Sequence, residues 1–285
     1  GQGLYLYPPP LGIAFEPFAA FAPASGAVLW YLFKIGALAL AAALMPVRPA
    51  TRLLAFGLTA IGFAAARDLT MGNVSTLLLV PLAAGWRWLD RPAGSVALAL
   101  ATSVRASMGA FLLWFAVRRQ WRLLGWMIAT GLATIALTLP FVGLDGYGDY
   151  FAMLGNVGGT GNLEQNRHVT ALAKALGLDP DRWWLLVVPT LVLTVSAVVL
   201  STRRDAATGY MVTAAATLLL APLMWDHYLA LLMLPAAFLF ERGRRWGILL
   251  PLCSWAPAPL MPLVAIAALL LPFLARGLPA SDRAV

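Results

Sequence analysis

Four polar stretches interrupt an otherwise apolar sequence, and they carry the side chains whose types and spacing could do chemistry. Ionisable residues at a membrane boundary are costly unless they are used, which makes these stretches the candidate site. The stretches are Trp225-Asp226-His227, the isolated Arg105, the turn with Arg67, Asp68 and Asn73, and the long polar segment 143–182, which contains Asn166, Arg167 and His168.

These residue types favour a substrate that joins an anionic head group to a sugar. The planar guanidinium of Arg105 could bind two oxygens of a phosphate. Asp226 and Asp68 are the carboxylates that could take a proton as a general base. Asn, His and Trp side chains suit sugar hydroxyls and sugar faces. With two histidines, one cysteine and no cluster of ligands, the sequence predicts no metal site.

Each stretch also has a structural interpretation, which the sequence leaves open. The tryptophan could anchor the chain at the membrane interface, and the adjacent Asp226 and His227 could cap helix ends. Arg105 could extend its charged end toward water. Asp68 could only pair with Arg67, and the long polar segment could be a solvated connector.

The composition defines the class of protein that must position these residues. The chain has 285 residues, of which 61% are apolar and 11% charged, and its mean hydropathy is +0.81. These values exclude a water-soluble globule and a disordered chain, and despite the net charge of +8 they predict no nucleic-acid partner. We expect one all-α domain, 1–285, that is a polytopic transmembrane helical bundle. About eleven apolar segments are predicted: 24–45, 53–66, 74–88, 93–104, 107–117, 123–142, 183–201, 206–224, 228–240, 246–256 and 260–274.

The basic residues predict the orientation of these segments. They cluster between apolar runs, at 118–122, 203–204 and 242–245, as in cytoplasmic loops. If 93–117 were one span, the later clusters would lie outside, so the chain is expected to reverse near Arg105. The four polar stretches, including the loop 143–182, then share the extracytoplasmic face of a plasma (inner) membrane, and the C-terminus is cytoplasmic.

Several motifs, in order along nearly the whole chain, resemble glycosyltransferase family 87. These polyprenyl-phosphate-mannose-dependent α-mannosyltransferases have the GT-C membrane fold. The most specific element is 221–227, Ala-Pro-Leu-Met-Trp-Asp-His, where the family form is close to Ser-Pro-x-Ser-Trp-Asp-His. The other elements are Tyr7-Pro8-Pro9-Pro10, the stretch 71–79 from Met71 to Leu79, Arg105 with 111–122, and the loop 161–168.

The resemblance implies transfer of a hexose, by this family mannose, from a polyprenyl-phosphate sugar to a hydroxyl of a glycan or glycolipid. Arg105, with Arg67, would stabilise the departing phosphate, and Asp226 and His227 would hold sugar or acceptor. Tyr7, Asn73, Trp225, Asn166, Arg167 and His168 complete the expected substrate-binding set. No cofactor is expected. The family's presumed catalytic Asp precedes the Tyr-Pro-Pro element, so we expect the base upstream of Gly1, in a first span and outer loop that this chain lacks.

Two other classes stay open at this point. A transporter would place polar groups at mid-membrane, where Lys34 is the one charge expected. A non-catalytic membrane scaffold would be compatible with the missing upstream acid. Sugar-transfer and uptake measurements would discriminate between these classes.

Overall fold

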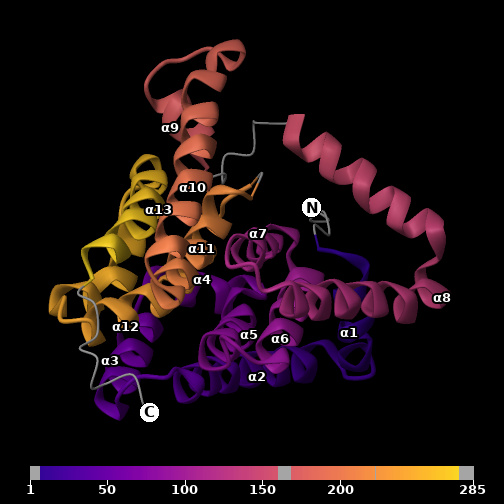
Figure 1. Cartoon of the computed structure of the whole chain (residues 1–285). Coiled ribbons are helices and arrows are strands. Elements are labelled where there is room, and N and C mark those ends of the chain that lie inside the picture. Colours follow the sequence, from indigo (N-terminus) through magenta and orange to yellow (C-terminus); the bar gives the residue numbers. More distant parts are fainter. Residues whose placement is uncertain (1–6, 160–167, 222, 276–285) are drawn as a thin grey trace.

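The computed structural model describes residues 7–159, 168–221 and 223–275, and every regular element in these ranges is a helix (Figure 1). This confirms the all-α class. The α-helices are α1 (Pro9–Ala19), α2 (Pro23–Leu44), α3 (Pro49–Ala60), α4 (Phe63–Met71), α5 (Ser75–Arg87), α6 (Pro92–Val104), α7 (Ala110–Val117), α8 (Trp121–Gly159), α9 (Val169–Ala175), α10 (Trp184–Arg204), α11 (Ala206–Leu219), α12 (Met233–Glu241) and α13 (Met261–Leu270). The 3-10 segments are η1 (Ala106–Gly109), η2 (Pro180–Arg182), η3 (Asp226–Leu232), η4 (Arg245–Trp255), η5 (Ala258–Leu260) and η6 (Leu271–Leu274).

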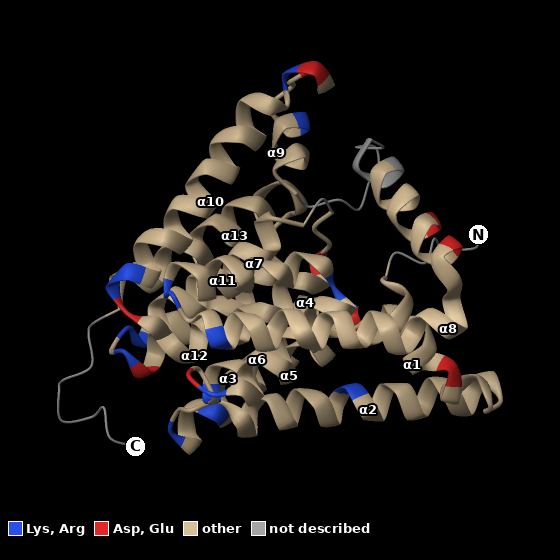
Figure 2. Cartoon of the chain, turned by 45° about the vertical axis from the view of Figure 1, so that its right-hand side comes forward, with Lys and Arg blue, Asp and Glu red and all other residues tan. Residues whose placement is uncertain are grey.

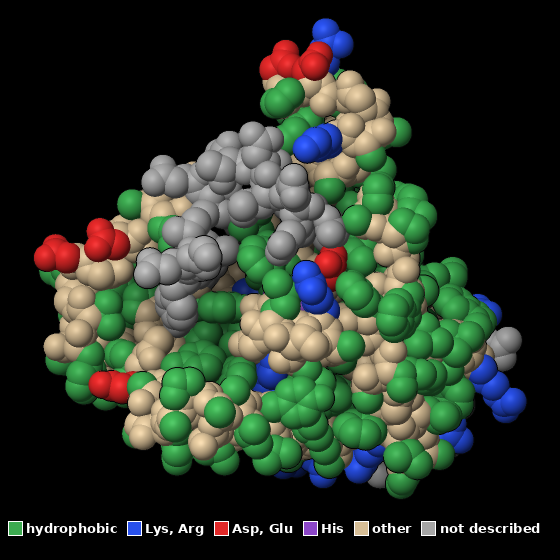
Figure 3. Space-filling model, turned by 180° about the vertical axis from the view of Figure 1, so that it is seen from behind, with side chains coloured by type: hydrophobic (Ala, Val, Ile, Leu, Met, Phe, Trp, Pro, Cys, Tyr) green, Lys and Arg blue, Asp and Glu red, His purple; other side chains and the backbone are tan. Residues whose placement is uncertain are grey.

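Three helices in the described ranges are long and apolar enough to cross a membrane: Pro23–Leu44, Trp121–Gly155 and Pro180–Arg204. The α3–α4 pair, bent by 61°, would be a fourth if it forms one broken span. Large apolar side chains on these helices point outward, as a lipid-facing surface requires, and apolar groups cover much of the face in Figure 3. The predicted count of eleven segments is not confirmed, because most other helices have 14 residues or fewer.

The core forms around α11 and α12. Every residue from Thr208 to Leu219 is buried, as is every residue from Met233 to Leu239, so these helices are enclosed on all sides. Helix α10 packs closely on α11 at Gly209, where an added Cβ would lie 2.6 Å from the Thr202 Cα atom. Of the three long helices, α10 packs directly on α11, whereas α2 packs on α5 and α8 packs on α6.

The chain reverses at Arg105, as the charge pattern predicted. Helix α6 ends at Val104, Arg105 is extended (φ −147°, ψ 111°), and η1 and α7 lead back. The Arg118 Nη2 atom, just after α7, lies 2.7 Å from the Asp90 Oδ1 atom, just before α6. Gln120 also donates to Asp90, at 2.8 Å. Both ends of the segment therefore meet on one side, and Arg105 lies at the opposite end.

The predicted loop 143–182 is largely helical where the structure describes it. Gly143 has φ +71° and ψ 171°, a non-helical conformation that L side chains rarely adopt, so α8 consists of two helical stretches that meet at a kink there. The second stretch continues to Gly159 with apolar residues at 144, 147, 151 and 154, a helical spacing. Helix α9, Val169–Ala175, adds a short second helix within this segment.

The charges are separated along the molecule. Figure 2 shows Lys and Arg gathered near α3 and α12, whereas the part of α8 beyond Gly143 carries acidic residues. Near α3, Arg48 Nε lies 3.0 Å from Glu241 Oε2, and Arg242 lies 3.7 Å from Asp205. One end of the bundle is therefore basic, as the positive-inside pattern predicted.

Candidate functional site

The break after α6 places the Arg105 guanidinium inside the protein. Arg105 is only 7% exposed, and its Cζ atom lies 3.4 Å from the centre of the Tyr228 ring. Tyr228 follows His227 in η3, so the arginine lies against the Trp-Asp-His element. Neither terminal nitrogen of Arg105 has a hydrogen-bond partner among the described residues. The face of the Tyr228 ring stabilises the guanidinium cation. The two terminal nitrogens of Arg105, its strongest donors, are left available for an anion.

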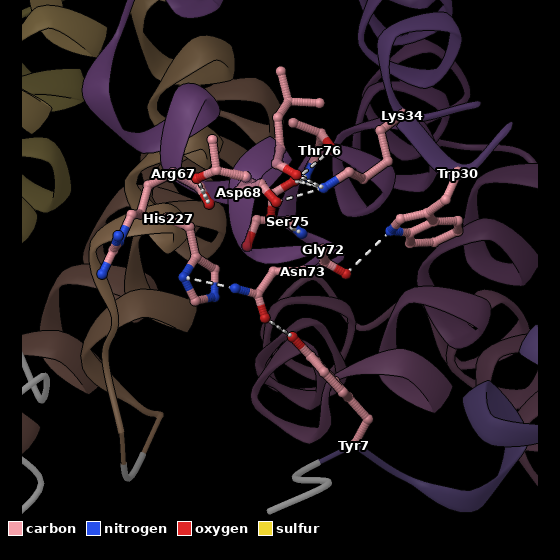
Figure 4. Close-up of polar contacts among 12 residues, drawn as sticks. Tyr7, Trp30, Lys34, Arg67, Asp68, Gly72, Asn73, Ser75, Thr76 and His227 are labelled. Atoms are coloured by element: carbon pink, nitrogen blue, oxygen red, sulfur yellow. Dashed lines mark hydrogen bonds and ion pairs between the residues drawn. The ribbon is translucent and has the colours of Figure 1, made fainter. Parts of the chain in front are cut away.

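A chain of hydrogen bonds links Tyr7, Asn73 and His227, which come from three different parts of the fold (Figure 4). Tyr7, which precedes α1, donates its hydroxyl to the Asn73 Oδ1 atom at 2.9 Å. Asn73 lies in the turn between α4 and α5, and its Nδ2 atom is 3.3 Å from the His227 Nδ1 atom. The structure therefore brings together Tyr7, Asn73 and His227, which are far apart in the sequence.

Aromatic rings fix the plane of the His227 imidazole. Its ring is nearly perpendicular to that of Tyr228, with 4.6 Å between centres, and to that of Trp225, with 5.5 Å. His227 is 1% exposed, and its Nε2 atom has no hydrogen-bond partner among the described residues. The Trp225 Nε1 atom is likewise buried and without a partner there. His227 and Trp225 therefore each present a buried ring nitrogen without a partner among the described residues.

Asp68 has a structural task at the edge of this cluster. Its Oδ1 atom accepts the Ser75 backbone N–H at 2.8 Å, and its Oδ2 atom accepts the Thr76 hydroxyl at 2.7 Å, which caps the start of α5. Its ion-pair partner is Lys34 at 3.5 Å, not Arg67 as the sequence suggested. Both side chains of the pair are 0% exposed. A carboxylate held in this way is poorly suited to take a proton from an acceptor.

Arg67 lies on α4 and Asp226 lies on η3, and these two elements pack against each other beside His227. Both are partly exposed. Arg67 and Arg105 act electrostatically on the His227 ring, as does Lys34. The site is therefore electropositive, and Asp226 is the carboxylate nearest in sequence to its centre.

Of the predicted residues in the long segment, the structure describes His168. His168 is buried, and its Nε2 atom lies 3.1 Å from the backbone oxygen of Leu219. Burial lowers the pKa of His168, against the opposing effect of this hydrogen bond. Asn166 and Arg167 lie outside the described residues.

Sequence reasoning missed the roles of two residues. Tyr228 was assigned no role from the sequence, although its position directly after Asp-His could have indicated a ring for a cation. Lys34 was expected as the one charge at mid-membrane, and only the fold shows that it pairs with Asp68. No group of three metal-binding side chains occurs in the part of the chain that the structure describes.

The cluster presents buried N–H donors and positive charge, so it can hold an anion next to groups that suit a sugar. The arginine offers two donors, the histidine offers one ring nitrogen, and Trp225 offers its indole N–H. Donors preorganised in a buried setting stabilise developing negative charge strongly.

Comparison with known proteins supports this interpretation at the level of the family. The family model for Glycosyltransferase family 87 matches residues 5–225, which include Tyr7, Asn73 and Arg105 and end two residues before His227. No curated protein and no solved structure gives a match to the chain. Because the family match spans most of the sequence, this chain belongs to glycosyltransferase family 87.

Proposed function

We propose that this membrane glycosyltransferase moves a hexose, mannose by the family resemblance, from a polyprenyl-phosphate donor to a hydroxyl of a glycan or glycolipid. The observation that carries the proposal is the buried Arg105 side chain. It lies on the face of Tyr228, and both of its terminal nitrogens lack a partner among the described residues. A guanidinium in this state needs an anion, and a lipid phosphate supplies one.

In this proposal, Arg105 binds the phosphate and stabilises the charge that develops as the sugar–phosphate bond breaks. Arg67 adds positive charge from α4. Trp225 contacts the sugar or the acceptor hydroxyl, whereas His227, which Asn73 contacts, lies on the phosphate side of the site with Arg105. The reaction is group transfer between oxygens, so this scheme uses no cofactor.

The proton of the acceptor hydroxyl needs a carboxylate base. Asp68 is fully buried beside Lys34, whereas Asp226 is partly exposed and adjoins His227, so Asp226 is the better candidate within the chain.

The separation of charges supports placing the site on the extracytoplasmic face of the plasma membrane. Basic side chains gather near α3 and α12, which would then face the cytoplasm together with the C-terminus (Figure 2). Arg105 lies at the other end of the α6–α7 reversal, away from Asp90 and Arg118. A donor and an acceptor in the outer leaflet would reach it there.

Sugar transfer from polyprenyl-phosphate mannose to a glycolipid acceptor, by purified protein in lipid nanodiscs, tests the proposal. Arg105→Ala should lower the rate by about a hundredfold, typical for removing an oxyanion donor, and Arg105→Lys should retain part of it. Arg91→Ala is the matched control, because Arg91 is exposed at the other end of the same helix. Equal rates for Arg105→Ala and Arg91→Ala would overturn the proposal.

No observation favours a transporter or a scaffold. The charge that suggested a transport path, Lys34, is 0% exposed and paired with Asp68. Uptake of labelled sugar into proteoliposomes without transfer would support the transporter instead.

A further inference from the structure

The orientation of one side-chain amide determines which nitrogen of His227 carries a proton. The Asn73 amide has one accepting end and one donating end. Tyr7 donates its hydroxyl to the Oδ1 atom at 2.9 Å, so the Nδ2 amino group faces His227. An amino group can only donate here, and the His227 Nδ1 atom at 3.3 Å must therefore accept.

The surroundings of His227 disfavour a second proton on the ring. The imidazole is 1% exposed and experiences the positive charges of Arg105, Lys34 and Arg67. Burial and like charge both disfavour an imidazolium. In the neutral ring one nitrogen donates and the other accepts. If Nδ1 accepts from Asn73, the single proton resides on Nε2.

The Nε2 atom is buried and has no partner among the described residues. The flanking rings of Trp225 and Tyr228 hold the imidazole at steep angles, so it has little room to turn. The guanidinium of Arg105 lies on the same Tyr228 ring. A proton on Nε2 therefore adds a neutral donor beside the cationic donors of Arg105.

We propose that Tyr7 and Asn73 are positioning residues that hold His227 as the Nε2–H tautomer, so that this N–H donates to an oxygen of the bound lipid phosphate. The ligand half of this proposal rests on the proposed function, whereas the tautomer half concerns the unliganded protein alone. Both hydrogen bonds donate in the same direction, from the Tyr7 hydroxyl to Asn73 and from the Asn73 amino group to the His227 ring. Tyr7 and Asn73 thus act on the ligand through His227.

Nitrogen-15 NMR of the purified full chain, labelled only at histidine, measures the tautomer directly. The chain has two histidines, and His168 is an internal reference, because its Nε2 atom faces the carbonyl oxygen of Leu219 and must donate. We expect both histidines of the unliganded wild type to show the Nε2–H pattern. A His227 resonance with the proton on Nδ1, or with two protons, would overturn the proposal.

Asn73→Asp replaces the amino group that donates to His227 by an accepting oxygen, with almost no change in the shape of the side chain. A carboxylate can only accept, so it should move the His227 proton to Nδ1 and leave His168 unchanged. Tyr7→Phe removes only the hydroxyl, so the amide can turn over and both tautomers of His227 should appear. Tyr147→Phe is the matched control, because that hydroxyl contacts Thr138 within α8. An unchanged His227 tautomer in both Asn73→Asp and Tyr7→Phe would contradict the proposal that Tyr7 and Asn73 set the tautomer; we call this hydrogen-bonded series of Tyr7, Asn73 and His227 the relay.

Binding of polyprenyl monophosphate separates the relay from the proposed function. Asn73→Asp and His227→Ala should each weaken binding by about tenfold or more, because each removes a donor to a charged acceptor, whereas His227→Gln should retain part of the affinity. If the tautomer changes as expected but His227→Ala binds as well as wild type, the ligand half fails and the relay stands. If Arg105→Ala also binds as well as wild type, the proposed function fails with it.

Discussion

Replacing Lys34 by Met tests the buried ion pair that fixes the turn carrying Asn73. Lys34 Nζ lies 3.5 Å from Asp68 Oδ2, and both side chains are 0% exposed. At this separation and an effective dielectric constant of about 20, the attraction is about 5 kcal/mol. Lys34→Met leaves a buried carboxylate without its counter-charge, although the Ser75 and Thr76 donors remain. We therefore expect a loss of about 3–5 kcal/mol in the free energy of unfolding.

The double variant Lys34→Met with Asp68→Asn should recover most of that loss, because no charge remains buried. Unfolding by SDS titration in mixed micelles, followed by tryptophan fluorescence, gives the four free energies of the cycle. Lys174→Met is the matched control, since Lys174 is exposed on α9, and it should change stability by less than about 0.5 kcal/mol. Additive effects of the two substitutions, or a Lys34→Met protein as stable as wild type, would refute the reasoning.

Three further predictions follow from packing, titration and ligand chemistry. Gly209→Ala should destabilise the protein, because the added Cβ would lie 2.6 Å from the Thr202 backbone. In Gly131→Ala, on α8, the added Cβ meets nothing within 4 Å, so this variant should be more stable by up to about 1 kcal/mol. Thermal unfolding of both variants checks these predictions. Because burial lowers the pKa of His168, its contribution to stability is fully present above about pH 6.5 and is lost as pH falls toward the folded-state value. His168→Gln, which keeps a donor to Leu219, should reduce the loss of stability between pH 7.5 and pH 5.5, and an unchanged loss would contradict the assignment. Sugar transfer should persist in excess EDTA, because in the proposed scheme the guanidinium of Arg105 supplies the positive charge at the departing phosphate. Inhibition that added Mg²⁺ or Mn²⁺ reverses would disprove this.

The helical class and the reversal at Arg105 could be predicted from the sequence because both follow from strong physical constraints. Long apolar runs can only be helices in lipid, and the positive clusters after Val117 require the chain to turn back. The number of membrane crossings could not be predicted in this way. Apolar runs of 10–15 residues suit short buried helices as well as membrane spans. The burial of α11 and α12 on all sides shows that these two runs are interior helices.

The candidate site, too, could be predicted from the sequence only in part. The residue types identified Arg105, Asn73 and His227, and the fold brings them together with Tyr7 and Trp225. The partners were not predictable, because Lys34 meets Asp68 across 34 positions and Tyr7 meets Asn73 across 66. Gly143 was also missed as a kink, since a glycine before a polar stretch predicts a loop as readily as a redirected helix.

Equilibrium binding of polyprenyl monophosphate and of the uncharged polyprenol to the full chain in nanodiscs tests the central claim, that the buried Arg105 recognises a lipid phosphate. The account predicts that the wild type binds the phosphate at least about tenfold more tightly than the alcohol. Arg105→Ala should abolish that preference, and Arg91→Ala should keep it. Equal affinity of the wild type for the two lipids, or a preference that survives Arg105→Ala, would contradict the account.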